Sequence, residues 1–183
     1  MIVSVIGNKN SGKSSFAEDY VCKIDGSKYY IATMRIKNDD DKAKIEKHRA
    51  SREGKDFITI EQDVAIVRAI EKIKWMESLL GTADGKRTAL IECLPTLVAN
   101  EMILNSGEIV PHKDVENTIL FGIAFLKEFF DNIVIVSDDE PDIAYYGGLT
   151  DASEEAKNEY LEAMKELSAA IRNLSEEVYE GPF

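Results

Sequence analysis

The sequence has few basic residues and no long apolar run, and each shortage excludes a class of protein. Lysine and arginine number 22 against 34 aspartates and glutamates, which gives a formal net charge of −12. Because surfaces that bind nucleic acid are basic, this balance argues against nucleic acid as a partner. No apolar run reaches the roughly 18 residues that a membrane span needs, and no basic leader with a cleavage site is recognisable. We therefore expect a cytoplasmic protein with no membrane span.

Cysteine is also scarce. Cys22 and Cys93 are the two cysteines, and they stand far apart without CxxC spacing. The pattern predicts two reduced thiols of a cytosolic protein, not a disulfide framework or a zinc site. The 183 residues, of which 44% are hydrophobic, suit a single domain over residues 1–183 with an ordinary core.

Short apolar runs alternate along the chain with segments of helical periodicity. Strands are expected at 2–6, 29–33, 58–60, 88–93 and 133–137, and helices at 14–22, 39–52, 64–80 and 115–130. The last helix has the clearest apolar stripe, formed by Ala156, Tyr160, Ala163, Met164, Leu167, Ala170, Ile171 and Leu174. The alternation predicts an α/β fold, in which a mostly parallel sheet has helices on both faces.

Residues 7–14, GNKNSGKS, fit the Walker A pattern G-x-x-x-x-G-K-[ST] between an expected strand and an expected helix. The two glycines let the loop curl so that its N–H groups point at a phosphate, and the positive end of the helix adds to the attraction. Lys13 would bind the outer phosphates and Ser14 would ligate Mg²⁺. The motif therefore predicts a P-loop NTPase (RecA-like) domain whose nucleotide-binding residues are Gly7, Asn8, Lys9, Asn10, Ser11, Gly12, Lys13, Ser14 and Ser15.

Two other segments hold candidates for chemistry. Glu92, in the expected strand 88–93, is a candidate metal ligand; the alternative is a strand-end carboxylate that faces solvent. His48, Arg49 and Arg52 cluster on one helix, because positions 48 and 52 are one turn apart. Nearby cations repel a metal, whereas arginines bind phosphate oxygens and a neutral imidazole can attack phosphorus. The alternative is a surface histidine on a solvated charged helix.

The sequence resembles the bifunctional adenosylcobinamide kinase/adenosylcobinamide-phosphate guanylyltransferase family of cobalamin biosynthesis. The resemblance is carried, in order, by GNKNSGKS, by YIAT at 30–33, by IEKHRASR at 45–52, by ECLPTLVAN at 92–100 and by IVIVSDD at 133–139. The histidine and arginines behind a Walker A loop are its most specific part.

This resemblance implies a P-loop fold, Mg²⁺, ATP and GTP as substrates, a corrinoid acceptor and a homotrimer. It implies that a nucleoside triphosphate phosphorylates the aminopropanol hydroxyl of adenosylcobinamide, after which GMP passes from GTP through a histidine to the phosphorylated corrinoid. On this chain His48 would be the guanylylated nucleophile, and Arg49 and Arg52 would stabilise the developing charge. Lys13 would hold the phosphates, while Ser14 and Glu92 would hold the metal.

The chain also departs from the family pattern. Glu92 stands in place of an aspartate, Pro95 and Leu97 replace a hydroxyl residue and a tryptophan, segment 137–148 lacks a glycine and the family's IVP, and the C-terminal segment is shorter. Most of these changes lie where the acceptor site would be shaped. Two alternatives therefore stay open: a P-loop small-molecule kinase with a different acceptor, and a nucleotide-binding regulatory module without turnover.

Overall fold

A six-stranded parallel sheet forms the centre of the protein, in the strand order β3-β2-β4-β5-β1-β6. A computed structural model describes residues 1–36, 39–81, 85–103, 112, 114–141, 143 and 149–183. The strands are β1 (Ile2–Ile6), β2 (Ser27–Ala32), β3 (Phe57–Glu61), β4 (Arg87–Ile91), β5 (Asn132–Ser137) and β6 (Glu177–Glu180).

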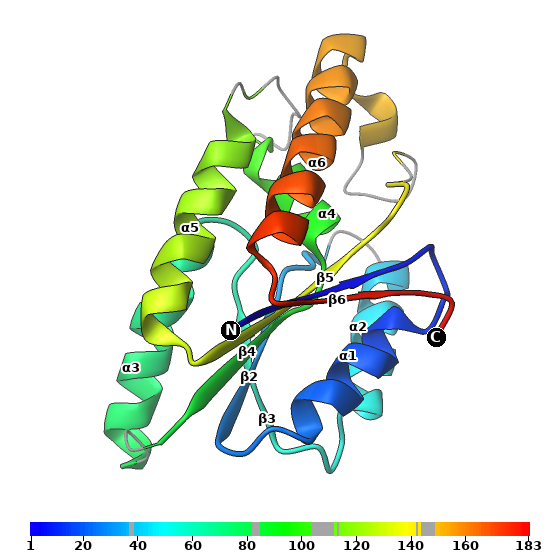
Figure 1. Ribbon diagram of the computed structural model, residues 1–183. Coiled ribbons are helices and arrows are strands. Elements are labelled where there is room, and N and C mark those ends of the chain that lie inside the picture. Colours follow the sequence, from blue (N-terminus) through cyan, green and yellow to red (C-terminus); the bar gives the residue numbers. More distant parts are fainter. Residues whose placement is uncertain (37–38, 82–84, 104–111, 113, 142, 144–148) are drawn as a thin grey trace.

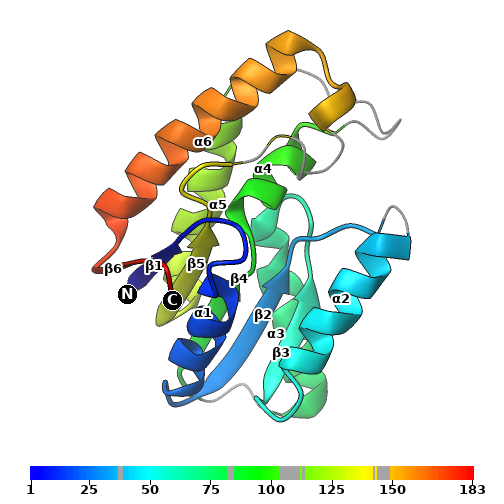
Figure 2. The ribbon, with the colours of Figure 1, turned by 90° about the vertical axis from the view of Figure 1, so that its right-hand side faces the viewer.

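Helices cover both faces of this sheet (Figures 1 and 2). One face carries α1 (Lys13–Cys22) and α2 (Asp39–Ser51). The other carries α3 (Ala69–Leu80), α4 (Leu94–Glu101), α5 (Val115–Phe129) and α6 (Glu154–Leu174), with the short 3-10 turns η1 (Ile66–Arg68) and η2 (Leu149–Asp151). The described helices include none that is both long and apolar enough to cross a membrane.

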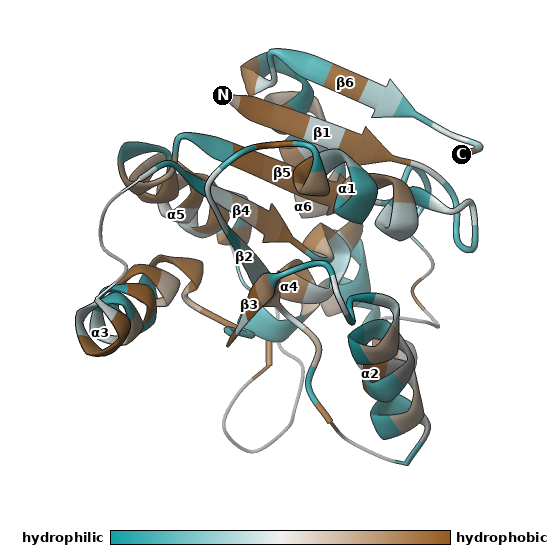
Figure 3. Cartoon of the chain, turned by 90° about the horizontal axis from the view of Figure 1, so that it is seen from below, coloured by the Kyte–Doolittle hydropathy of each residue, from teal (hydrophilic) through white to brown (hydrophobic). Residues whose placement is uncertain are grey.

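The sheet has a hydrophobic core on each face, because successive side chains of a strand point in opposite directions. On β2, Tyr29 and Ile31 belong to the core beneath α3 to α6, whereas Tyr30 belongs to the core beneath α1. Figure 3 shows that strands β1, β5 and β4 are largely hydrophobic. Since all six strands are parallel, the loops that follow them meet at one edge, where α/β proteins bind ligands.

A buried polar cluster ties the sheet to α3. The Tyr29 hydroxyl donates a hydrogen bond of 2.6 Å to Glu77. Nε and Nη2 of Arg87 donate to the two oxygens of the same carboxylate at 2.7 and 3.0 Å. Both carboxylate oxygens of Glu77 therefore accept from protein donors.

The expected α/β class and the five expected strands are confirmed, with boundaries that differ by at most two residues. The expected helix 64–80 is wrong at its start, where Ala65 has a left-handed φ of 46° and a 3-10 turn precedes α3. The predicted stripe of α6 is buried except for Ala170, which is half-buried, and Leu174, which is 48% exposed. Two elements, α4 and β6, were not predicted from periodicity: α4 is buried along almost its whole length, and β6 has four residues.

Candidate functional site

The predicted phosphate-binding loop connects β1 to α1 at the carboxyl edge of the sheet. Gly12 has a φ of 88° and no side chain of the described residues caps the first turn of α1, so the N–H groups there are left for a ligand. The Ser11 hydroxyl is buried without a hydrogen-bond partner among the described residues. Asn8, Lys9, Asn10 and Ser15 are exposed, Ser14 is half-buried and Gly7 is buried. This backbone has the features of an anion-binding turn.

Lys13 of this loop is held by oxygen atoms. Its ammonium lies 2.7 Å from Asp138 Oδ1 and donates to the Asn8 carbonyl at 3.2 Å. Asp138 is only 4% exposed and directly follows β5, the strand that lies between β1 and β4. Asp138 was not predicted as a site residue, although its place directly after a buried apolar strand was a signal.

The end of the chain packs against the same loop. The Phe183 N–H donates to the Ser11 carbonyl at 3.0 Å, and its ring centroid lies 4.6 Å from that of Phe16. A Cβ atom on Gly12 would lie 3.1 Å from the Phe183 carbonyl oxygen. Glycine at this position therefore serves both the backbone angle and this close contact.

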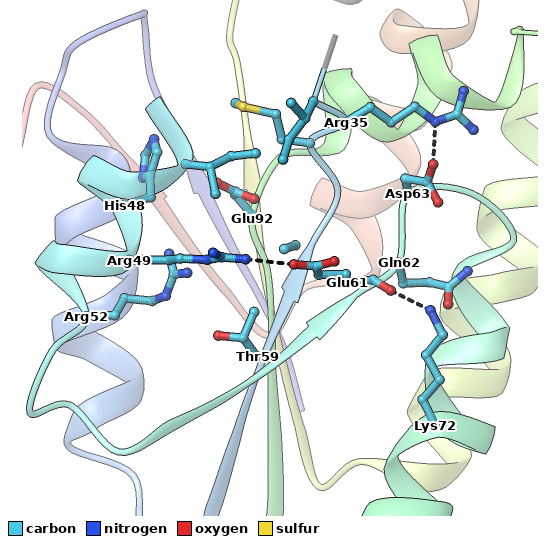
Figure 4. A pocket seen from close by; sticks show the side chains of 14 residues that line it. Arg35, His48, Arg49, Arg52, Thr59, Glu61, Gln62, Asp63, Lys72 and Glu92 are labelled. Carbon is cyan, nitrogen blue, oxygen red and sulfur yellow. Dashed lines mark hydrogen bonds and ion pairs between the residues drawn. The ribbon is translucent and has the colours of Figure 1, made fainter. Parts of the chain in front are cut away.

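A cavity of about 500 Å³ lies beside β2 and β3 at the same edge (Figure 4). One wall is α2, which supplies His48 and Arg49, and Arg52 follows directly after it. Glu92 lines the cavity from the end of β4. The remaining lining residues are Ala32, Met34, Arg35, Ile36, Ile45, Thr59, Glu61, Gln62, Asp63 and Lys72.

The two arginines of this cavity differ in environment. Arg49 spans to β3, where its Nη2 lies 2.8 Å from Glu61 Oε1, and both side chains are largely exposed (Figure 4). Arg52 is only 8% exposed, and its Nη1 has no hydrogen-bond partner among the described residues. Its guanidinium carbon lies 3.5 Å from the centroid of the Tyr30 ring. A buried cation without a bonded anion is costly, which marks Arg52 as a place for an anionic ligand.

Glu92 acts electrostatically on Tyr30. Burial and the negative charge of Glu92 raise the pKa of the Tyr30 hydroxyl. The phenol therefore stays protonated. Because Glu92 is 8% exposed, the alternative of a carboxylate that faces solvent is wrong.

The floor between the strand ends is fixed by neutral hydrogen bonds. Asn100 Nδ2 donates to the Thr33 carbonyl at 2.7 Å, and Thr33 Oγ1 donates to the Cys93 carbonyl at 3.2 Å. Burial raises the pKa of the Cys93 thiol to about 12, so it stays protonated and is a poor nucleophile. Cys22 is also a free thiol.

The structure thus brings His48, Arg49, Arg52 and Glu92 together around one cavity. The loop residues 7–15 do not line it. The link is the order of the strands, since Glu92 follows β4 and the Lys13 partner Asp138 follows the adjacent β5. Half of the altered segment 137–148, namely residues 142 and 144–148, lies outside the described residues.

Comparisons with known proteins identify the family and the fold. The family model described as cobinamide kinase / cobinamide phosphate guanyltransferase matches residues 3–180. No curated protein matches the chain. Among the solved structures that match, an ATPase domain has a TM-score of 0.50 at 10% identity, over 92% of this chain. The chain spans 66% of that domain, and the likeness shows the P-loop fold.

Proposed function

Because the chain belongs to the cobinamide kinase / cobinamide phosphate guanyltransferase family, whose members are enzymes that transfer phosphoryl and nucleotidyl groups, we propose that it phosphorylates adenosylcobinamide and then guanylylates the product. In the first reaction, the aminopropanol hydroxyl attacks the γ-phosphorus of ATP or GTP and the nucleoside diphosphate leaves. In the second, GMP is transferred from GTP to the phosphate group just added.

The guanylyl transfer would pass through His48. An imidazole nitrogen attacks the α-phosphorus of GTP, a phosphorus–nitrogen bond forms, and the bond to the bridging oxygen breaks as pyrophosphate leaves. A phosphate oxygen of the corrinoid then attacks the same phosphorus and releases the neutral histidine. This route replaces one difficult displacement by two easier ones.

One observation carries this proposal: His48, Arg49 and Arg52 of the α2 segment line the same cavity as Glu92. A nucleophile and two guanidinium groups in one cavity suit an attack on a phosphate anion, because the cations stabilise the charge that develops. A solvated surface histidine would not need Arg52 to be buried beside it.

The residues of the loop and the strand ends suit Mg²⁺, which prefers hard oxygen ligands and keeps several waters. Ser14 and Glu92 would hold the ion, and Ser11 offers a buried hydroxyl that has no partner among the described residues. When bound, Mg²⁺ would neutralise charge on the transferred phosphoryl group. Lys13 would exchange its contact with Asp138 for the phosphates of the nucleotide.

The decisive experiment is the intact-protein mass after incubation with GTP and Mg²⁺. We expect a gain of one GMP, labile to acid and stable to base. His48→Ala should abolish the adduct, and His112→Ala is the matched control because His112 is the other histidine of the chain and does not line the cavity. An adduct that survives His48→Ala would reject the nucleophile.

The same assay separates the alternatives. ADP release with a corrinoid or another alcohol, but without any adduct, would favour a kinase with a different acceptor. Tight nucleotide binding without products above a Lys13→Ala control would favour a regulatory module. We also propose the homotrimer and the cytoplasmic location that the family resemblance implies; light scattering of the purified protein tests the first.

A further inference from the structure

We propose that Lys55 is a positioning residue, which ties the segment that carries His48 and Arg52 to α1, the helix of the phosphate-binding loop. Because the loop residues 7–15 do not line the cavity of His48, a nucleotide held by the loop reaches the imidazole only if α1 and α2 keep their relative place. The inference rests on the proposed function for the role of His48. Lys55 itself does not line the cavity.

On the side of α1, the Lys55 ammonium binds two carboxylates of the helix that begins at Lys13. Its Nζ lies 2.9 Å from Glu18 Oε2 and 2.9 Å from Asp19 Oδ1. Glu18 is only 2% exposed, whereas the side chain of Asp19 is 65% exposed. Solvent screens the Asp19 contact, so the contact with Glu18 is the one that fixes the ammonium.

On the side of α2, Lys55 belongs to a tight turn that follows the helix. Its N–H donates to the Arg52 carbonyl at 3.0 Å, and the Arg52 N–H donates to the Arg49 carbonyl at 3.1 Å. Gly54 and Asp56, on either side of Lys55, have left-handed φ angles of 79° and 55°. These hydrogen bonds and backbone angles restrict the turn, so the place of Lys55 decides where Arg52 lies.

Hydrophobic packing alone would hold α1 on the sheet without a buried carboxylate. Ala17 and Val21 of α1 belong to the core beneath this helix, and the burial of a charge costs free energy that its partner returns only in part. An ion pair is directional, however, because the buried charge is satisfied only when its partner is in one place. Since α1 and α2 lie on the same face of the sheet (Figure 2), the pair of Glu18 and Lys55 sets their separation.

Single-turnover kinetics at saturating GTP test this assignment. An attack on phosphorus tolerates little misplacement, and an error of about 1 Å can slow it about 100-fold. We expect Lys55→Met to slow formation of the protein–GMP adduct about tenfold, and to leave the Kd of GTP within about twofold because the loop is intact. Lys55→Arg retains the charge and should restore the rate to within about threefold of the wild type. A purely structural role would lower stability and leave the rate of the folded molecules unchanged.

A double-mutant cycle and a matched control complete the test. Glu18→Gln should slow the reaction as Lys55→Met does, and the double variant should be no slower than either single one. Lys157→Met is the control, because the Lys157 side chain is 21% exposed against 25% for Lys55, and its Nζ lies 2.9 Å from Glu154 on α6. It should change neither the rate nor the Kd.

A normal rate in Lys55→Met, a loss that Lys55→Arg does not restore, or additive effects in the cycle would overturn the inference. If Lys55→Met does not fold, Glu18→Gln and Lys55→Arg decide. Hydrogen exchange of the α2 amides without nucleotide needs no turnover. Exchange should be faster in Lys55→Met and Glu18→Gln than in the wild type, and unchanged in Lys157→Met. If the wild type forms no adduct, the proposed function is rejected, and this exchange alone decides the role of Lys55.

Discussion

Tyr29 and Tyr30 are adjacent on β2 and lie on opposite faces of the sheet. Near each of them lie one glutamate and one arginine. Tyr29 contacts Glu77, which binds Arg87 through two hydrogen bonds. On the other face Arg52 stacks on Tyr30 and shares a cavity with Glu92, and no ion pair joins Arg52 to Glu92 among the described residues. The first cluster is closed, since its charges satisfy each other. The second is open, and a buried charge that the protein does not satisfy points to a ligand.

The pKa values reflect the same contrast. The hydrogen bond from Arg87 lowers the pKa of Glu77, despite burial, and the pairing raises that of Arg87. Burial, together with the hydrogen bond to Glu77, raises the pKa of Tyr29 to about 12. The closed cluster therefore stabilises its own charged state, and its contribution belongs to folding.

Breaking the closed cluster should produce the largest effect. Arg87→Met leaves the Glu77 carboxylate buried without its cation, which we expect to lower the free energy of unfolding by about 3–5 kcal/mol. The nucleotide affinity of the folded molecules should not change, because Arg87 is not among the cavity residues. Urea unfolding and a GTP titration measure the two quantities. A stable variant with impaired GTP binding would contradict the division between the clusters.

The corresponding change in the open cluster should impair the reaction and leave the stability intact. Arg52→Met should slow formation of the protein–GMP adduct about 100-fold, the typical loss for a group that stabilises transition-state charge. Its free energy of unfolding should stay equal or rise, since an apolar side chain replaces a buried cation that has no ion-pair partner among the described residues. Rapid-quench kinetics measure the rate of adduct formation, and urea unfolding measures the stability. A fall of several kcal/mol with normal kinetics would make Arg52 a structural residue.

The smallest predicted effect is a difference in acid sensitivity. Glu77 has a lowered pKa in the folded state, so the stability that it contributes is present above its ordinary pKa of 4.5 and is lost as the pH falls through the folded value. Wild type and Glu77→Gln should therefore differ in unfolding free energy at about pH 6 and converge as the pH falls through the lowered pKa of Glu77. Urea unfolding at a series of pH values measures this difference. A difference between the two proteins that grows as the pH falls would refute the role given to Glu77.

The sequence allowed the fold class and the phosphate-binding loop to be predicted, because both depend on local patterns. The phosphate-binding motif occupies consecutive residues, from Gly7 to Ser14, and the strands are recognisable as short apolar runs. The α2 cluster was predicted as a helical neighbourhood for the same reason, since His48 and Arg52 are one turn apart.

The open cluster could not be predicted from local patterns. Tyr29 and Tyr30 are adjacent and identical in kind, and their difference lies in which distant carboxylate acts on each one. Glu77 comes from a helix 48 residues further on, whereas Glu92 depends on the register between β2 and β4. Asp138 reaches Lys13 only because β5 lies beside β1. Strand order therefore decides the partners, and no short-range signal encodes it.

The contact between Phe183 and the phosphate-binding loop has a consequence for the edge of the sheet. The hydrogen bond of Phe183 to Ser11 joins the loop to the segment that follows β6, which is paired to the sheet only through β1. Linkage is reciprocal, so a nucleotide that orders the loop must also order the segment bonded to it. Amide protons of β6 should then exchange with deuterium more slowly once GTP is bound, which turns an outer strand into a reporter of occupancy at the loop.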